Sequence, residues 1–288
     1  MSLATWRLVS FLIFSLGVAT LTHLPSVNDD LSIVFRGPMN LYHISVYQPN
    51  GSNGNWQRTS QFNPNQSPDN MVFLSNKGGG PSGVFDFCSG LSQAYVSSDF
   101  QNAVASPAGV QPNGILADGV EMNIMTKTAC NGTSTCAGYS RGVAQRGWAG
   151  SKMFVMTFDM PHGSGNDMPA IWALNGQVMR SAQYGCNCRG MGANGGCGEL
   201  DLLEVIQKGG DAISQIYSFK GSTGTGNANV FPRATTKVTY AFLFDVKTDQ
   251  IAIQKWNSFN TGTSGYTRAA IDNFLNSNAM IIPFKANL

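Results

Sequence analysis

The sequence has few charged side chains. Its 288 residues include 18 Lys and Arg, 16 Asp and Glu and 3 His, so charged residues make up 12% of the chain and the formal net charge is +2. A nucleic-acid-binding surface needs clustered basic side chains, and this balance gives no case for one. The 33 glycines and the short apolar runs are typical of a turn-rich β protein. Such a surface suits a neutral polymeric ligand.

Long hydrophobic runs are also missing after the N-terminus. Arg7 precedes one apolar segment, residues 8–18, and Gly17 and Ala19 fit the small-residue positions before a cleavage site. We therefore predict a secretory signal peptide over residues 1–19, because the run is shorter than the ~20 residues of a membrane span. A signal-anchor helix is the alternative. After cleavage we expect a secreted protein with no stable membrane insertion.

No internal repeat and no linker divides the rest of the chain, so residues 20–288 are predicted to form a single domain. Apolar or alternating segments separated by Gly, Pro, Asn and Ser predict β-strands. They cover residues 31–35, 41–47, 56–62, 71–74, 120–126, 152–160, 169–174, 199–205, 214–219, 236–245 and 250–256. Residues 269–276 fit one short helix, and the small polar stretch 89–119 is predicted to be a surface excursion. This rhythm predicts an all-β antiparallel sandwich.

Six cysteines indicate an oxidising compartment. Cys130 and Cys136 enclose a short loop and are predicted to form a disulfide. The pairing of the other candidates stays open; they are Cys88, Cys186, Cys188 and Cys197. Neither their spacing nor the scattered histidines fit a zinc site, so we predict no metal and no cofactor. Glycosylation sequons at Asn50 and Asn131 agree with secretion.

One segment, ELDLLEV, concentrates acidic side chains among large apolar ones. Strand side chains alternate between two faces, so Glu199 and Asp201 share a face while Glu204 points to the other. One extra residue, a β-bulge at Leu202 or Leu203, returns Glu204 to their face, and bulges are common beside active sites. A helix and a strand with an acidic solvent face are the alternatives.

Three carboxylates on one face have a chemical use. Two carboxyl groups about 5–5.5 Å apart are the equipment of a retaining glycosidase, and an intervening Asp can hold two glutamates in different protonation states. Trp148 and Tyr184 are candidates for stacking on a sugar, with core packing as the alternative for each. Arg180 and Gln183 lie in the preceding loop and are candidates for hydrogen bonds to sugar hydroxyls, with a solvated loop as the alternative.

Two segments together resemble glycoside hydrolase family 16. One is the E-x-D-x-x-E pattern, and the other is residues 168–174, MPAIWAL, which are similar to a strand of laminarinase-type members. From about Phe35 to Gln254 the chain more closely resembles the target-of-SBF family of fungal cell-wall proteins. The motifs that carry this resemblance are WQR (56–58), MVFLSN (71–76), DMPAIWALN (167–175), QYGCNC (183–188) and GCGELDLLEV (196–205).

These resemblances imply a β-jelly-roll sandwich, concanavalin A-like, with long loops and a concave sugar-binding cleft. They imply that Glu199 is the nucleophile, that Asp201 assists it and that Glu204 is the acid/base. They also put Trp172 beside the carboxylates, as the first choice for stacking on the sugar. The implied activity is that of a retaining, endo-1,3-β-glucanase-like hydrolase, secreted and associated with the cell wall. We expect a monomer whose partner is a β-glucan polysaccharide or oligosaccharide.

Three other functions fit parts of the sequence. A glucan transglycosylase would use the same site with a sugar hydroxyl in place of water. A non-catalytic glucan-binding or structural wall protein would keep the sandwich and bind without cleaving. A calcium-binding sandwich would use Asp and Asn side chains on loops. The presence of all three acids favours catalysis.

Overall fold

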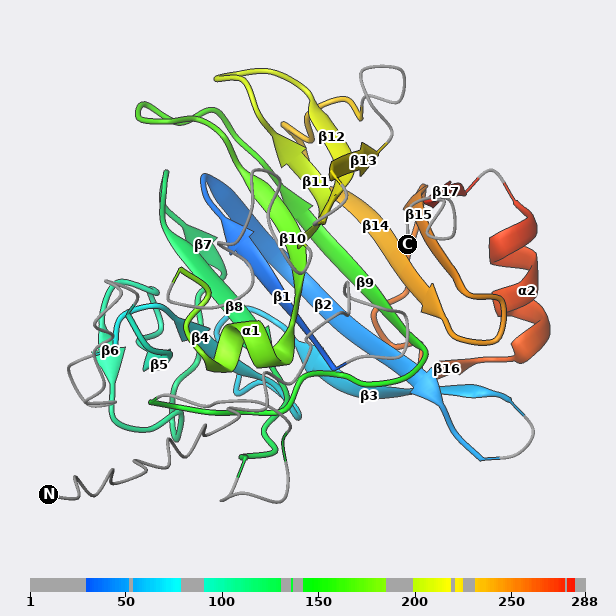
Figure 1. Ribbon diagram of the computed structural model, residues 1–288, viewed down its shortest axis with the longest axis horizontal. Coiled ribbons are helices and arrows are strands. Elements are labelled where there is room, and N and C mark those ends of the chain that lie inside the picture. Colours follow the sequence, from blue (N-terminus) through cyan, green and yellow to red (C-terminus); the bar gives the residue numbers. More distant parts are fainter. Residues whose placement is uncertain are drawn as a thin grey trace, which may run out of the picture.

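The computed structural model describes residues 30–51, 54–78, 91–130, 136, 142–184, 199–218, 221–224, 231–277 and 279–282. These residues form two curled antiparallel sheets packed face to face, so the prediction of an all-β, jelly-roll-like sandwich is confirmed. Figure 1 shows the long strands of both layers running diagonally across the molecule. The predicted signal peptide, residues 1–19, lies outside the described residues.

The first sheet carries the acidic segment. In order across the described part of this sheet, its strands are β13 (Gly221–Gly224), β12 (Ala212–Ser218), β11 (Glu199–Val205), β10 (Ala170–Asn175), β1 (Leu31–Arg36), β8 (Glu121–Met125), β4 (Val72–Ser75), β5 (Ala94–Val96) and β6 (Ala103–Val104). Because β1 lies between β10 and β8, the first described strand of the chain is central in the sheet.

The second sheet packs behind the first. Its described strands, in order, are β16 (Gly265–Tyr266), β3 (Trp56–Phe62), β2 (Met39–Pro49), β9 (Lys152–Asp159), β14 (Val238–Asp245), β15 (Gln250–Trp256) and β17 (Met280–Ile282), and β7 (Ile115–Leu116) pairs with β2. Two helices complete the described chain, α1 (Gly176–Arg180) next to β10 and α2 (Arg268–Asn276) against the second sheet (Figure 1).

A continuous apolar core fills the space between the sheets. Ile33 and Phe35 of β1 and Ile171 of β10 meet Phe154 of β9 and Phe242 of β14, and all five are 0% exposed. Burying a side chain of this size stabilises the fold by roughly 1.5–3 kcal/mol. The intervening residues of β1 are buried on the opposite face, which explains its continuous apolar run.

The sequence predicted most elements with the correct type. Residues 56–62 and 250–256 are observed as β3 and β15, and the predicted helix is α2. Helix α1 was not predicted; it begins at once after β10, where the Asn175 side chain accepts a hydrogen bond of 2.8 Å from the Gln177 N–H. None of the helices in the described ranges is long and apolar enough to cross a membrane.

One prediction about the fold is wrong. Residues 89–119 were expected to be a surface excursion, but their described part, from residue 91, contains β5, β6 and β7. Phe100 and Leu116 are 0% and 2% exposed and join the core between the sheets. Single apolar residues among small polar ones are enough to hold this segment against the sandwich, because each buries a large area.

An ion pair fastens α2 to the second sheet. Both Asp245 carboxylate oxygens accept hydrogen bonds of 2.8 Å from the Arg268 guanidinium, and the Asp245 side chain is 0% exposed. Burial alone raises the pKa of Asp245, but the hydrogen bonds from Arg268 and Thr248 outweigh it, and the pKa lies below its usual value. The folded state therefore favours the ionised carboxylate.

Replacing Asp245 by Asn should lower the free energy of unfolding at pH 7 by about 3 kcal/mol, because it breaks a buried pair and leaves one partner behind. A depressed folded-state pKa contributes stability above the unfolded-state pKa, near 3.9, and this contribution is lost as the pH falls through the folded-state pKa. The difference between wild type and Asp245→Asn should therefore shrink below about pH 4. Urea unfolding at pH 7 and pH 3 measures both effects.

The matched control is Asp272→Asn, which removes the other carboxylate that Arg268 contacts. The Asp272 side chain is 42% exposed, so solvent screens its pairing with Arg268, and its loss should lower the free energy of unfolding much less than the loss of Asp245. Equal losses in the two variants, or a loss for Asp245→Asn that does not change with pH, would contradict this account.

Candidate active site

Strand β11 carries one extra residue in the middle of the acidic segment. Against β10, Ile171 pairs with Leu203 and Trp172 pairs with Asp201, so Leu202 is left over. The register against β12 shifts over the same stretch. Two residues opposite one define a β-bulge, and the bulge predicted from the spacing of the acids is confirmed.

The bulge sorts the side chains of β11 between the two faces of the sheet. The four apolar side chains of the segment all lie in the core between the sheets; they are Leu200, Leu202, Leu203 and Val205. The side chains of Glu199, Asp201 and Glu204 lie on the outer face, where Trp172 is the cross-strand neighbour of Asp201. Glu199 and Glu204 are half-buried, and Asp201 is 1% exposed. We call this surface the acid face.

Arg36, at the end of β1, is the counter-ion of Glu204. Its Nη2 donates a hydrogen bond of 3.0 Å to Glu204 Oε1, and its Nε donates one of 2.6 Å to the Met168 carbonyl. The guanidinium also lies 5.7 Å from the centroid of the Trp172 ring, a cation–π distance. Three contacts of different kinds therefore hold the Arg36 side chain across β10, where it reaches Glu204 on β11.

Glu121 of β8 is the cross-strand neighbour of Arg36 and adds a fourth carboxylate to the acid face. Its Oε1 lies 4.0 Å from Arg36 Nη1, and its Oε2 accepts a hydrogen bond of 2.6 Å from the Tyr184 hydroxyl. Glu121, Glu199 and Glu204 are the only glutamates in the sequence. All the glutamates of the chain thus gather on one face of one sheet.

Trp172 lies on the acid face but is almost covered. Its side chain is 3% exposed and packs with Val34, Leu174 and Met179 in an apolar cluster on this outer face. Within the described part of the chain, its buried indole Nε1 has no hydrogen-bond partner. The ring is next to the acids, as the resemblance implied. A sugar can stack only on an uncovered ring face, so the stacking role of Trp172 stays a prediction.

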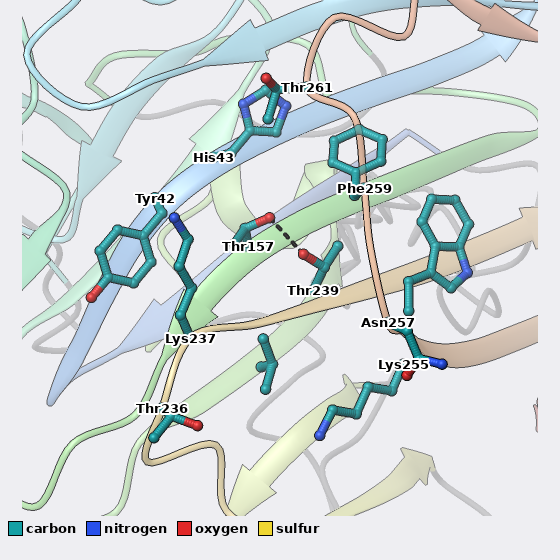
Figure 2. A pocket seen from close by; sticks show the side chains of 12 residues that line it. Tyr42, His43, Thr157, Thr236, Lys237, Thr239, Lys255, Asn257, Phe259 and Thr261 are labelled. Atoms are coloured by element: carbon teal, nitrogen blue, oxygen red, sulfur yellow. Dashed lines mark hydrogen bonds between the residues drawn. The ribbon is translucent and has the colours of Figure 1, made fainter.

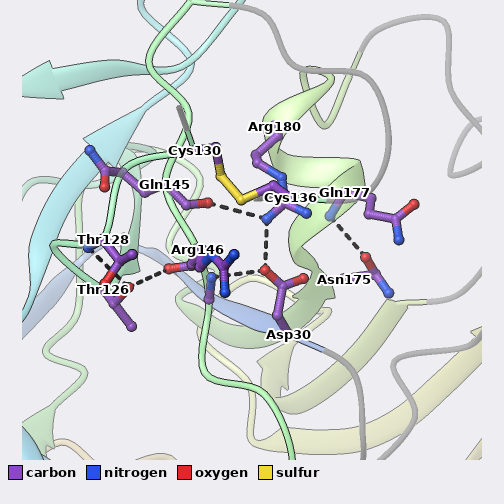
Figure 3. The surroundings of a disulfide bond; sticks show 11 residues. Asp30, Thr126, Thr128, Cys130, Cys136, Gln145, Arg146, Asn175, Gln177 and Arg180 are labelled. Carbon is purple, nitrogen blue, oxygen red and sulfur yellow. Dashed lines mark hydrogen bonds and ion pairs between the residues drawn. A yellow bond between two sulfur atoms is a disulfide. The ribbon is translucent and has the colours of Figure 1, made fainter. Parts of the chain in front are cut away.

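Three of the predicted sugar-binding residues lie in other surroundings. Trp148 is 1% exposed in the core, where its indole N–H donates a hydrogen bond of 2.9 Å to Ser60 Oγ. Arg180 is 1% exposed, and its Nη1 donates to Asp30 Oδ2 at 2.7 Å, near the disulfide in Figure 3. Gln183 is 2% exposed. Core packing, the alternative for Trp148, is therefore correct, and the solvated-loop alternative for the other two is not.

Tyr184 differs from these three because it is 49% exposed. Its ring is accessible at the edge of the acid face, and its hydroxyl is held by Glu121. Tyr184 is thus the one predicted binding residue that is both exposed and anchored to this face within the described part of the chain.

The strand that carries Trp172 is fixed at its start by a buried ion pair. Arg233 binds the Asp167 carboxylate and also donates to the carbonyls of Met160 and Pro161, 2.8 and 2.6 Å away. Burial raises the pKa of Asp167, but hydrogen bonds from the Gly163 N–H and from Arg233 outweigh it and hold the pKa well below its usual range. This buried charge pair therefore fixes the segment whose Met168 carbonyl accepts the hydrogen bond from Arg36.

The disulfide predicted between Cys130 and Cys136 is present, with Cα atoms 5.5 Å apart (Figure 3). The other cysteine candidates lie outside the described residues; they are Cys88, Cys186, Cys188 and Cys197. Asn50 is exposed, as a glycosylation site requires, and Asn131 lies outside the described residues. Glycosylation at both positions stays a prediction.

A hollow of about 450 Å³ lies on the other side of the sandwich. It opens on the outer face of the second sheet, over β2, β9, β14 and β15 (Figure 2). None of the described residues that line it is a carboxylate, so the hollow differs from the acid face in both position and chemistry.

Sequence reasoning missed Arg36 and Glu121. Arg36 lies just outside the predicted strand 31–35, and Glu121 is one polar position of the predicted strand 120–126. Their role depends on strand order, since only in the folded sheet does β1 lie next to β10 and β8 lie next to β1. The only local signal was the scarcity of glutamate, which sets Glu121 apart because the sequence has just two others, Glu199 and Glu204.

Residues 54–273 match the model of a family described as "Cell wall protein YJL171C/Tos1, C-terminal". Among curated proteins, a probable circularly permuted 1,3-beta-glucanase of Schizosaccharomyces pombe is 35% identical over 245 residues, which cover 79% of this chain and 47% of that protein. A protein of the same description, TOS1 of Candida albicans, is 37% identical over 200 residues, covering 64% of this chain and 42% of its own.

TOS1 of Saccharomyces cerevisiae, again named a probable circularly permuted 1,3-beta-glucanase, is 38% identical over 199 residues, covering 64% of this chain and 41% of that protein. The chain therefore spans about half the length of the curated relatives it matches. No solved structure matches the chain. The family suggested by the sequence motifs is confirmed.

The contact between Arg36 and Glu204 can be measured as a coupling energy. In a double-mutant cycle with Arg36→Met and Glu204→Gln, we expect about 1–3 kcal/mol of coupling in the free energy of unfolding, because the pair is hydrogen-bonded and the two side chains are only 23% and 18% exposed. Urea unfolding of the four proteins measures it.

The control cycle combines Arg36→Met with Glu121→Gln. The 4.0 Å separation of this pair exceeds hydrogen-bond length, so its coupling should stay below about 1 kcal/mol. Equal coupling in both cycles would show that Arg36 is not specifically the counter-ion of Glu204.

Proposed function

Since the chain belongs to the Tos1 C-terminal family of cell wall proteins, we propose that it is a secreted hydrolase that cleaves cell-wall β-1,3-glucan with retention of configuration. The observation that carries this proposal is the β-bulge at Leu202, which leaves Glu199, Asp201 and Glu204 on one outer face beside Trp172. The names of the curated relatives, probable 1,3-beta-glucanases, support the substrate class.

In the first step, a carboxylate oxygen of Glu199 attacks the anomeric carbon of the sugar. Glu204 donates its proton to the glycosidic oxygen as the bond to the leaving chain breaks, and a glycosyl ester forms on Glu199. In the second step, Glu204 accepts a proton from water, whose oxygen attacks the same carbon and releases Glu199. Two inversions at one carbon give net retention.

Asp201 lies between the two glutamates along the strand and is nearly fully buried. Its carboxylate raises the cost of a second and third negative charge nearby, which favours one protonated and one ionised glutamate. In this mechanism Asp201 does not touch the anomeric carbon; it sets the charge state of the residues that do.

Arg36 must move for Glu204 to act as an acid. A guanidinium in hydrogen-bond contact stabilises the carboxylate, whereas a proton donor has to carry a proton. Glu121, 4.0 Å from the same guanidinium, offers a second carboxylate on the opposite side. We propose that substrate binding shifts Arg36 towards Glu121 and so releases Glu204 for proton transfer.

The same first step also permits transfer of the glycosyl group to a sugar. If a hydroxyl of a second glucan chain reaches the glycosyl ester before water does, the product is a longer chain. Chromatography of the products from laminarihexaose distinguishes the outcomes, because hydrolysis yields only shorter oligomers.

The decisive variants are Glu199→Gln and Glu204→Gln, assayed for reducing sugar released from laminarin. Loss of the nucleophile should lower kcat by at least about 10³-fold, since no glycosyl ester can form, and loss of the acid/base should lower it by about 10²–10⁴-fold. Added azide should rescue Glu204→Ala and give a product of retained configuration, because azide attacks the glycosyl ester without needing a base.

Two control variants accompany this experiment. Glu121→Gln alters the third glutamate of the acid face and should lower kcat by at most about tenfold, since Glu121 acts through Arg36 and Tyr184 and does not touch the reacting atoms. Asp272→Asn, on α2, should leave kcat unchanged. Wild-type turnover in Glu199→Gln would refute the nucleophile assignment, and glucan binding without product from the wild type would indicate a non-catalytic wall protein.

A further inference from the structure

The outer face of the second sheet changes character along its strands. Under α2 this face is apolar, and Val155 of β9 and Ala241 of β14 belong to one buried cluster with Ile271 of the helix. Two residues away on the same strands, and hence on the same face, the side chains are Thr157 and Thr239. No residue of α2 lines the hollow at this end of the face.

A row of four cross-strand neighbours passes through this end of the face. His43 of β2 pairs with Thr157, Thr157 pairs with Thr239, and Thr239 pairs with Trp256 of β15. The two threonines are only 7% and 9% exposed, and they share a hydrogen bond of 2.8 Å between their hydroxyls (Figure 2). Whichever hydroxyl accepts that bond keeps its own proton for a further acceptor.

Aromatic rings form one wall of the hollow. The ring of Phe259 lies 5.5 Å from that of His43 and 5.8 Å from that of Trp256, so it closes the space between β2 and β15 (Figure 2). Phe259 and Trp256 are both half-buried. They present apolar ring surface at the side of a floor that is made of hydroxyl groups.

Hydrogen-bond donors stand at the rim. Lys237, Lys255 and Asn257 are exposed and line the hollow, and in Figure 2 the two lysines lie on different sides of the threonine pair. The Lys237 ammonium is 4.7 Å from the centroid of the Tyr42 ring. Among the described residues no carboxylate lines the hollow, so none of them competes with a ligand for these donors.

His43 contributes shape rather than charge. Its ring nitrogens are 2.8 Å from Asn63 Oδ1 and 2.7 Å from Ser45 Oγ, and it is 1% exposed. Burial lowers the pKa of His43, which favours the neutral ring at pH 7. The groups that face it from the packed elements are Thr157, Phe259, Asn63, Ser45 and the Arg58 cation, whose charge acts in the same direction.

We infer that this hollow is a second carbohydrate-binding site, which holds a neutral pyranose unit of a polysaccharide chain on the side of the molecule opposite the acid face. The apolar face of the sugar ring fits the Phe259 and Trp256 wall, and its hydroxyls fit the threonine floor and the donors at the rim. The volume of about 450 Å³ is within the range of small-molecule sites. The inference uses only the chemistry of the lining and does not rest on the proposed catalysis.

A simple anion is the competing ligand, because two lysines line the rim. An anion would need neither the aromatic wall nor the hydroxyl floor, whereas a sugar ring needs both. Variants of the floor and of the wall therefore distinguish the two ligands.

The test uses the chain carrying Glu199→Gln, so that turnover does not consume the probe. Binding of laminarihexaose, cellohexaose and an α-mannan oligosaccharide is measured by calorimetry, with inorganic phosphate as the anion probe. In this background, the double variant Thr157→Val and Thr239→Val and the single variant Phe259→Ala should each raise the Kd of the bound oligosaccharide at least tenfold. The double valine variant keeps β-branched side chains of similar shape, so its Tm should stay close to that of the parent.

The matched control is Thr235→Val, a neighbouring exposed threonine that does not line the hollow, and its Kd should be unchanged. Unaltered oligosaccharide affinity in the folded floor and wall variants, or binding of none of the sugars, overturns the inference. Displacement of the sugar by phosphate at equal concentration, with loss of binding only in Lys237→Ala, would identify an anion site instead.

The rate of hydrolysis is measured separately, in the chain with Glu199 intact. Floor and wall variants should hydrolyse laminarihexaose at the wild-type rate, because the acid face is untouched. Binding without hydrolysis leaves this inference standing and refutes the proposed function, and hydrolysis without binding at the hollow does the reverse.

Discussion

The extra residue in β11 is the constraint on which the acid face depends. Glu204 lies an odd number of positions after Glu199, so in a regular strand the two side chains would point to opposite faces. One glutamate would then be buried in the core, or leucines would be exposed in its place. Either outcome is expensive, because a buried unpaired carboxylate costs several kcal/mol and an exposed leucine forgoes roughly 2 kcal/mol of burial. The bulge at Leu202 satisfies both demands, since the leucines all enter the core and the acids all leave it.

Carboxylates gathered on one face repel one another, and the positive charge of Arg36 offsets this repulsion. Every glutamate of the sequence lies on this face, and Arg36 is within 4.0 Å of two of them. Trp172 and the Met168 carbonyl limit where the guanidinium can go, and Met168 is itself fixed by the neighbouring Asp167–Arg233 pair. The charge balance of the site is therefore set by strands β1 and β8 as much as by the strand that carries the acids.

Local signals explain how much the sequence could predict. Alternation along single strands predicted most of the sandwich, the spacing of Glu199, Asp201 and Glu204 predicted the bulge, and the spacing of Cys130 and Cys136 predicted the disulfide. Contacts that depend on strand order were out of reach, which is why Arg36 was missed. Trp148 enters the core beside Leu31, to which it is joined by an isolated β-bridge, whereas Trp172 of β10 lies on the outer face next to the acids. These pairings form only in the folded chain, so the sequence could not tell the two tryptophans apart.

The two outer faces of the sandwich have opposite chemistry, and this bears on how a polymer would engage them. The acid face gathers carboxylates around one arginine, whereas the described lining of the hollow on the second sheet has lysines, hydroxyls and aromatic rings but no carboxylate. Because the core separates the faces, a short oligosaccharide cannot contact both at once. A long wall polymer can bind at both faces, through separate chains or distant segments of one chain. Binding at one face then raises the effective concentration of polymer at the other. The hollow would then retain the protein on the wall while the acid face releases its product.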